Sequence, residues 1–183
     1  FLLGQEELAY EVDAMTDHNT DRLFDLPGAH RCVFPVSRLV IDPERFIEDP
    51  MESVGMGVVY MRTAEGEALR DISDVDRSAL IDTYYCPHHA ALTCMVDECL
   101  GKHGRCLIID CHSFPEQPLP YESDQNRPDI CIGTDSYHTS TELRDCLLKT
   151  FEALGYVVTM DSPFSGTIVP LKHYHKDKRV ASV

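Results

Sequence analysis

The chain has 183 residues, 43% of them hydrophobic, so it can bury a substantial core and its length fits a single domain over residues 1–183. Its formal net charge is -15 at pH 7, and the acidic residues are spread along the chain rather than gathered in a tail. Such a field repels phosphate backbones and anionic lipid, which argues against nucleic acids and membrane surfaces as partners, and an anionic substrate would need locally concentrated arginine.

The first third of the chain combines a helical pattern with an apolar run. Apolar residues between Gln5 and Phe24 predict one helix or two short ones, which end at Leu26-Pro27-Gly28. The stretch from Cys32 to Ile41 is rich in β-formers and predicts a strand pair or one long strand, stopped by Asp42-Pro43. We expect the glycine- and methionine-dotted stretch 48–66 to form a loop over the site.

The rest of the chain alternates helices with short strands. A helical pattern runs from Ser73 or Asp74 to Gly101, and Pro87 inside it should kink or split the helix. The elements expected after it are a strand at Cys106–Asp110, a proline-rich loop at Phe114–Pro128, a strand at Asp129–Ile132, a helix from Thr139 or Ser140 to Leu154, a strand at Tyr156–Met160 and a short β-type run at Val180–Val183. This rhythm is typical of an α/β protein.

The eight cysteines are expected to be buried free thiols in a reducing cytosol, because the chain is far longer than small disulfide frameworks. The spacings Cys94-x4-Cys99 and Cys106-x4-Cys111 lack the two-residue spacing of structural zinc sites. The apolar start at Phe1–Gly4 is too short for a signal peptide, and no window approaches a membrane span. We therefore expect a cytoplasmic protein.

The most informative motif is Asp110-Cys111-His112-Ser113, which follows the apolar run Cys106–Ile109. It delivers an acid, an imidazole and a hydroxyl where a buried strand reaches its loop, and open α/β sheets keep their site residues there. Because histidine is the commonest metal ligand, we interpret His112 as a ligand; the alternative is a hydrogen-bonded structural side chain. Asp110 would then orient the imidazole or anchor the loop.

A second polar cluster, Asp-His-Asn-Thr-Asp-Arg, occupies residues 17–22. A carboxylate from it, Asp17, could complete a mixed His/Asp zinc site that leaves one position open for water. The alternative is a helix start in which Asp17 or Thr20 is the cap. The sequence leaves both interpretations open.

Two arginines, Arg38 and Arg45, follow or interrupt apolar residues. At least one should therefore point toward a cleft, where the planar guanidinium can hold a carboxylate through two hydrogen bonds. The competing interpretation is an internal salt bridge with Asp42 or Glu44. We favour substrate binding for one of the two.

Other histidines are weaker candidates. His88 and His89 are neighbours on a predicted helix and point roughly 100 degrees apart, so they are poorly arranged to share a metal. His173 and His175 alternate as in a strand, which places both rings on one face, although a charged edge beside Lys172 is the better interpretation. The sequence contains no Gly-x-Ser-x-Gly elbow, P-loop or dinucleotide fingerprint.

Four motifs occur along the chain: Asp17 with Arg22-Leu23-Phe24-Asp25, then Val36-Ser37-Arg38-Leu39-Val40-Ile41-Asp42 with Arg45, then Asp110-Cys111-His112-Ser113, then Pro163-Phe164-Ser165-Gly166. In this order they resemble the N-formylglutamate amidohydrolase family, relatives of the zinc carboxypeptidase and aspartoacylase fold. The resemblance covers nearly the whole chain. Its most specific pieces are Ser-Arg-x-x-Ile-Asp-x-x-Arg and Asp-x-His-Ser.

The resemblance implies an α/β fold with a mixed central sheet flanked by helices, of the zinc-carboxypeptidase (phosphorylase/hydrolase-like) type. It implies one zinc ion and hydrolysis of an N-acyl amino acid, typically N-formyl-L-glutamate to formate and glutamate. The matching positions give His112 and Asp17 as zinc ligands and Arg38 and Arg45 as the residues that grip substrate carboxylates. Bound zinc would lower the pKa of its water toward about 7. A glutamate would shuttle the proton to the leaving amine.

The chain departs from the family pattern in three places. The family opens with a Pro-His-x-Gly segment, and nothing before Glu11 matches it. The family also carries a glutamate in a strand near its carboxyl end, and this chain stops at Val183, about where that strand begins, so the catalytic residue is not identified here. The usual Asp-x-Asn-Arg reads Asp42-Pro43-Glu44-Arg45. We expect family segments to have been trimmed from both ends; the alternative is a member that has lost its metal and activity.

The expected function is zinc-dependent hydrolysis of a carbon–nitrogen bond other than a peptide bond. The expected partner is a small N-acyl amino acid, with no nucleic acid and no membrane, and a homo-oligomer is left open. The alternative is an inactive or divergent member that keeps the two arginines and binds small dicarboxylates. The change at Glu44 also permits another N-acyl amino acid as substrate.

Overall fold

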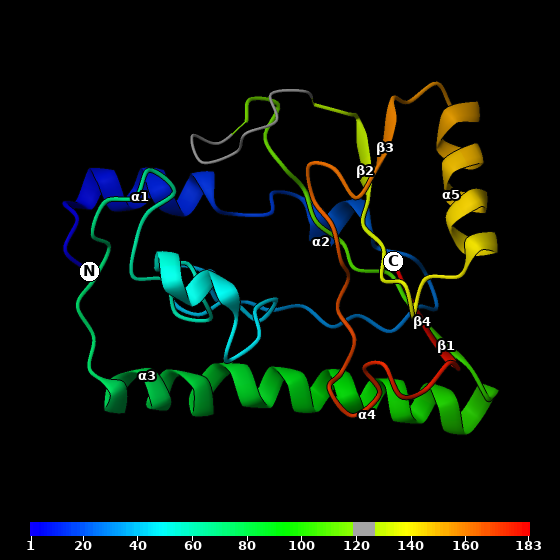
Figure 1. Cartoon of the computed structure of the whole chain (residues 1–183), viewed down its shortest axis with the longest axis horizontal. Coiled ribbons are helices and arrows are strands. Elements are labelled where there is room, and N and C mark those ends of the chain that lie inside the picture. The colour runs from blue at the N-terminus through cyan, green and yellow to red at the C-terminus, as the bar shows by residue number, and fades with distance from the viewer. Residues whose placement is uncertain (119–126) are drawn as a thin grey trace. The chain divides into compact units, whose positions relative to one another are not determined.

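The computed structural model describes residues 1–118 and 127–183, so the centre of the expected proline-rich loop lies outside the described residues (Figure 1). The elements are α1 Gln5–Ala14, α2 Thr20–Leu23, a 3-10 helix η1 Pro50–Val54, α3 Asp74–Leu80, a π-helix η2 Ile81–Tyr85, α4 Cys86–His103, β1 Cys106–Ile108, β2 Ile130–Ile132, α5 Thr141–Ala153, β3 Val158–Met160 and β4 Val180–Ser182. This combination confirms the predicted α/β class. Among the described helices, none is long and apolar enough to cross a membrane.

The chain folds as two compact units. The first unit contains Phe1–Leu92 and Ser113–Pro115, and the second contains Thr93–His112, Glu116–Pro118 and residues 127–183. The single domain expected from chain length stays a prediction.

The run of β-formers at 32–41 does not form a strand in the first unit, so that prediction is wrong. The chain turns instead, and the backbone N–H of Val40 donates to the carbonyl of Ser37 at 2.8 Å. In a strand, Leu39 and Ile41 would point to the same face. The turn places them in two different apolar clusters, both fully buried, and this long-range packing overrides the β propensity.

The segment expected to form a loop over the site is a large part of the core of the first unit. One cluster contains Met15, Leu39, Met56, Tyr60, Ala64 and Leu69, and the other contains Ile41, Val58, Val59, Ile81 and Tyr85. Residues 58–60 are almost fully buried. Their burial fixes the neighbouring polar groups as well, because the backbone N–H of Asp42 donates to the carbonyl of Val58 at 2.8 Å.

The predicted long helix forms as three consecutive helical segments, α3, η2 and α4, that follow one another without a break (Figure 1). Ser73 begins it, with its side-chain oxygen accepting from the N–H of Asp76 at 3.2 Å. Pro87 lacks an N–H, and its ring would crowd the carbonyl one turn earlier. The wider π-helical turn η2 ends at Tyr85, two residues before Pro87, and accommodates the ring, so the helix continues to His103, beyond the predicted end at Gly101.

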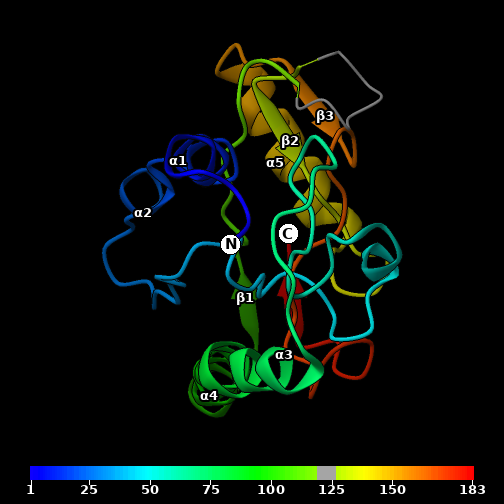
Figure 2. The same ribbon diagram turned by 90° about the vertical axis from the view of Figure 1, so that its left-hand side faces the viewer.

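The strands of the second unit pair in parallel. Strand β1 pairs with β4, with Cys106 opposite Val180, and β2 pairs with β3, with Ile130 opposite Val158. Helix α5 lies beside β2 and β3 (Figure 2). It begins at the predicted cap, Ser140, whose side chain accepts from the N–H of Leu143 at 3.2 Å.

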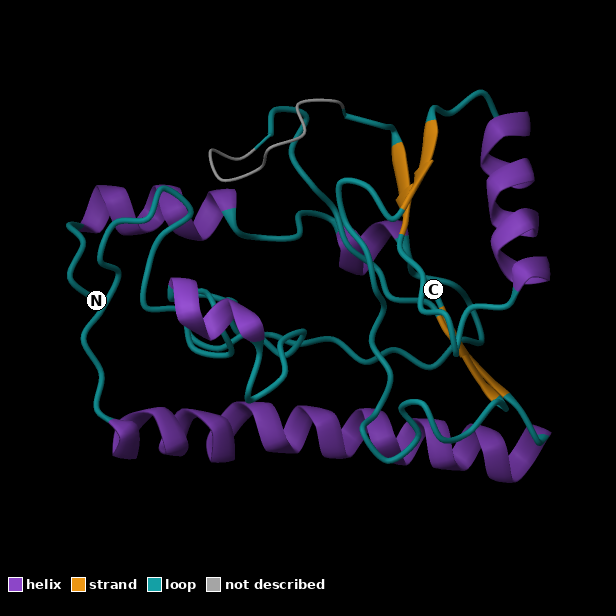
Figure 3. Ribbon diagram, viewed as in Figure 1, coloured by secondary structure: helices purple, strands orange, loops and turns teal. Residues whose placement is uncertain are grey.

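The described strands form two separate two-stranded sheets rather than the single mixed central sheet that the resemblance implied (Figure 3). The second edge of β4 is taken by the turn after β2. The N–H of Ser182 donates to the carbonyl of His138 at 3.1 Å, and the carbonyl of Ser182 accepts from the hydroxyl of Thr139 at 2.7 Å. These bonds satisfy the backbone groups that a further strand would pair with.

Two burial predictions are also corrected in the second unit. Strand β1 was expected to be buried, but Leu107 is 50% exposed and Ile109, just beyond its end, is 56% exposed. All eight cysteines of the whole chain are free thiols as expected, yet each is exposed or partly buried rather than fully buried.

Candidate functional site

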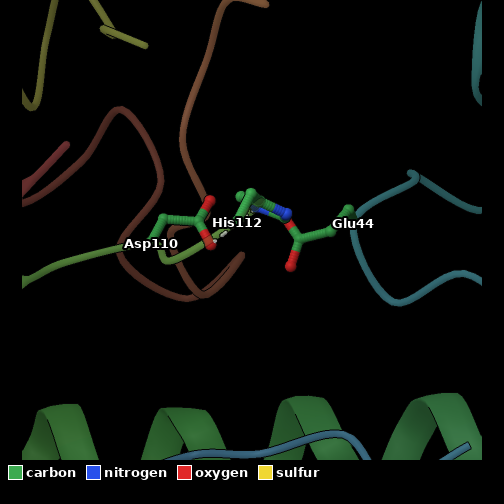
Figure 4. Close-up of side chains that lie close together, drawn as sticks. All are labelled: Glu44, Asp110 and His112. Atoms are coloured by element: carbon green, nitrogen blue, oxygen red, sulfur yellow. Dashed lines mark ion pairs between the residues drawn. The ribbon is translucent and has the colours of Figure 1, made fainter. Parts of the chain in front are cut away.

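His112 and Asp110 follow the end of β1 and face each other (Figure 4). The Nε2 atom of His112 lies 3.1 Å from Oδ1 of Asp110, and the imidazole is 41% exposed while the carboxylate is largely buried. The other carboxylate oxygen of Asp110 accepts from the N–H of Ile168 at 2.9 Å, which fixes the carboxylate. The histidine therefore lies at an accessible strand end, and Asp110 orients its ring.

This pair sets which ring nitrogen a ligand would meet. When Nε2 carries the proton and faces Asp110, the lone pair of the neutral imidazole is on Nδ1. A carboxylate that accepts from one ring nitrogen of a histidine is the usual support for a metal bound at the other. Glu44, also drawn in Figure 4, belongs to the first unit.

In the first unit, a buried carboxylate lies between the two predicted arginines. Asp42 is 1% exposed, and its Oδ2 lies 4.0 Å from both Nη1 of Arg38 and Nε of Arg45. The same oxygen accepts from the hydroxyl of Tyr60 at 2.7 Å. Its Oδ1 accepts from the N–H of Glu44 at 2.9 Å, so both oxygens are hydrogen-bonded.

Arg38 is also paired with Asp17. Its Nη2 donates to Oδ2 of Asp17 at 2.5 Å, and Oδ1 of Asp17 accepts from the backbone N–H of Ser113 at 3.2 Å. Burial works against the charge of this guanidinium, but the carboxylates of Asp42 and Asp17 outweigh it, so the pKa of Arg38 lies above its ordinary value. Arg38 is thus a charged guanidinium between two carboxylates, and its contact with Asp42 is the salt bridge that the second interpretation proposed.

The same contacts give Asp17 a function that neither sequence interpretation included. Asn19 takes the position before α2, so Asp17 does not occupy the N-cap of that helix, although its backbone carbonyl accepts from the hydroxyl of Thr20 at 3.1 Å. Its carboxylate pairs with Arg38 and Ser113. The zinc-ligand assignment of Asp17 stays a prediction.

Arg45 differs from Arg38 in its hydrogen bonding. Its Nε atom is buried, and within the described part of the chain no acceptor forms a hydrogen bond with it. The oxygen of Asp42 at 4.0 Å supplies charge but is too distant for a hydrogen bond. A buried donor without an acceptor costs about 1–3 kcal/mol, while the rest of the Arg45 side chain, which is 34% exposed, is the part that a ligand can reach.

The other histidines have structural partners in their own units. His89 contacts the carbonyl of Pro43 through Nε2 at 2.9 Å, and burial lowers the pKa of both His88 and His89. In the second unit, His173 and His175 lie in a turn rather than on a strand, and their Nε2 atoms pair with Asp97 and Asp135, each at 2.8 Å.

Tyr60 is the site-forming residue that sequence reasoning missed. It follows two valines, so the run had the character of apolar core, and the phenol does belong to a core cluster. Burial, and then the neighbouring Asp42 carboxylate, raise the pKa of Tyr60, which keeps the hydroxyl protonated as a donor. The only available signal was that a buried tyrosine hydroxyl needs a hydrogen-bond partner.

Comparisons with known proteins show the family through a family model and the fold through two solved structures. The family model described as N-formylglutamate amidohydrolase matches residues 2–183. The crystal structure of N-formylglutamate amidohydrolase from Ralstonia eutropha JMP134 is similar, with a TM-score of 0.61 and 24% identity over 80% of this chain and 60% of that chain. A gene product of Agrobacterium tumefaciens gives a TM-score of 0.56 and 23% identity over 70% of this chain and 47% of that chain.

The two solved structures share the fold, and this chain spans 60% and 47% of their lengths. No curated protein matches the sequence. The family match covers nearly every residue, including the two arginines and the Asp-x-His-Ser motif. The chain therefore belongs to the N-formylglutamate amidohydrolase family.

Proposed function

We propose that this chain is the scaffold of an amidohydrolase that cleaves the carbon–nitrogen bond of an N-acyl amino acid, with N-formyl-L-glutamate as the first substrate to test. The observation that carries the proposal is the buried, unbonded Nε of Arg45 next to the charged Arg38, both arranged around Asp42. Membership of the family supports the same reaction class. The zinc-carboxypeptidase-like form of the fold and a cytoplasmic location belong to the proposal too.

The two arginines would bind and orient the substrate through its carboxylates. A planar guanidinium presents several N–H donors, and Arg38 and Arg45 use few of them within the described residues. A substrate carboxylate would accept from the accessible part of the Arg45 guanidinium, since that side chain is 34% exposed. A hydrogen bond from a guanidinium to an anionic oxygen is stronger than one to a neutral oxygen, so the site favours an acidic substrate.

The proposed metal is zinc, and the residues of the second unit fit it in part. His112 would bind it through Nδ1, with Asp110 keeping the ring in place through Nε2. A catalytic zinc takes three protein ligands and a water, so His112 supplies one of them. When bound, zinc would polarise the acyl oxygen and activate water for attack on the acyl carbon.

The test measures metal content and turnover on the same purified protein. We expect about one zinc per chain and formate release from N-formyl-L-glutamate, with both lost in His112→Ala. The matched control is His103→Ala, an exposed histidine at the end of α4, which should keep both. Unchanged metal content in His112→Ala would remove the metal assignment. Glutamate binding without release of formate from N-formyl amino acids or of acetate from N-acetyl amino acids would support the binder instead.

A further inference from the structure

We propose that Tyr60 is a positioning residue for substrate recognition, acting through Asp42 to hold Arg38 and Arg45 at the spacing that a substrate carboxylate needs. This inference rests on the proposed function, because it assumes that the two arginines bind substrate. It adds a residue that lies in the core and whose hydroxyl donates to Asp42 rather than acting on the substrate directly.

Both carboxylate oxygens of Asp42 accept a hydrogen bond. A carboxylate that is 1% exposed has lost its water, and it is stable as an anion only when its oxygens accept hydrogen bonds and face positive charge. Within the described residues, the backbone N–H of Glu44 satisfies Oδ1, and the hydroxyl of Tyr60 is the one hydrogen-bond donor to Oδ2.

Both arginine contacts of Asp42 go to Oδ2, each at 4.0 Å, which is beyond hydrogen-bond distance. The 2.7 Å bond from Tyr60 therefore fixes the point toward which both guanidinium groups are attracted. Without it, Oδ2 is free to rotate toward one arginine and form a direct bond, which would use up a donor that the substrate needs.

The ring of Tyr60 is 1% exposed and packs with Leu39, Met56 and Leu69 in one apolar cluster. Side chains in such close-packed cores sit in well-defined rotamer minima, so the position of the phenolic oxygen is well defined. The packed ring of Tyr60 thus positions the Asp42 carboxylate through one hydrogen bond, and that carboxylate positions the two partly exposed arginines.

The test is Tyr60→Phe, which removes the hydroxyl and leaves the ring. The matched control is Thr63→Val in the same unit, because Thr63 is also buried and its hydroxyl accepts from the N–H of Glu67 at 3.0 Å, away from the arginines. The measurements are the Kd for L-glutamate by calorimetry, KM and kcat for N-formyl-L-glutamate, and zinc content. We expect Tyr60→Phe to weaken glutamate binding and raise KM by about tenfold, with kcat and zinc content unchanged.

Each other outcome is decisive. Wild-type affinity in Tyr60→Phe, or an equal loss in Thr63→Val, overturns the positioning assignment and leaves the proposed function standing. Absence of formate release by the wild type, with glutamate binding and its tenfold loss intact, overturns the hydrolase and leaves the positioning assignment standing. Absence of glutamate binding by the wild type removes the arginine anchors and the assignment of Tyr60 with them.

Discussion

Replacing Asp42 with Asn should destabilise the first unit by about 3 kcal/mol, because it removes the buried charge between two arginines. At 4.0 Å and an effective dielectric constant of about 20, each arginine–Asp42 pair has a Coulomb energy of about 4 kcal/mol, much of which offsets the desolvation of the charges. Arg38 keeps its ion pair with Asp17. Arg45 loses the carboxylate at 4.0 Å, and its side chain is 34% exposed, so water compensates part of the loss.

The assay is urea unfolding followed by circular dichroism, with the slope checked so that a change in midpoint reports stability. Asp13→Asn is the control, because that carboxylate is 78% exposed beside His18, and its loss should change stability by less than about 0.5 kcal/mol. A loss below about 1 kcal/mol in Asp42→Asn would refute the reasoning, since it would mean that the arginine charges do not depend on this carboxylate.

Three further predictions concern acid stability, thiol reactivity and a helix cap. Burial lowers the pKa of His88 and His89 in the folded protein, so the unfolded chain binds protons at a higher pH than the folded chain does. The free energy of unfolding should therefore be at its full value above pH about 6.5 and should fall toward pH 5. The urea midpoint should fall less over this range in the double variant His88→Gln/His89→Gln. Burial, and then a hydrogen bond with Cys99, raise the pKa of Cys106 to about 12. In a mass-spectrometric time course, iodoacetamide at pH 8 should therefore label Cys106 more slowly than the exposed Cys86 and Cys146. Equal labelling rates would contradict this. Ser140→Ala should cost about 1 kcal/mol in thermal or urea unfolding, because it removes the acceptor for the N–H of Leu143, and Ser53→Ala in η1 should cost less.

The elements that the sequence predicted well are those specified by neighbouring residues. Ser140 caps α5 and Gly155 follows its end with a positive φ of 92°, both through contacts within a few residues. One helix or two short ones were expected in the first 24 residues for the same reason, and two form. Local signals of this kind can be recognised in the sequence without knowledge of the tertiary fold.

The elements that were missed are decided by distant contacts. The turn at 37–40 exists because Leu39 and Ile41 pack into separate clusters with residues such as Tyr60 and Val58. No property of a run of β-formers encodes that choice, so the predicted strand was wrong. The π-helical turn before Pro87 was likewise foreseen only as a disturbance of the helix.

In the candidate site, too, residue types could be recognised from the sequence, whereas contacts between distant residues could not. The sequence singled out Arg38, Arg45 and His112 as candidates from their residue types and positions after apolar runs, and their roles stay predictions. The pairing of Arg38 with Asp17 joins residues far apart in the chain, and the bond from Tyr60 to Asp42 starts inside the core. These contacts depend on the folded backbone, so they become visible only in the structure.

The most direct test of substrate binding by Arg45 is the kcat/KM of Arg45→Gln for N-formyl-L-glutamate, compared with Arg144→Gln, which removes an exposed arginine on α5. We expect a fall of about 100-fold in Arg45→Gln, mostly through KM, because a charged donor to the substrate carboxylate is lost. The Arg144→Gln protein should match the wild type. A kcat/KM for Arg45→Gln equal to that of the wild type would contradict the claim that this arginine holds the substrate.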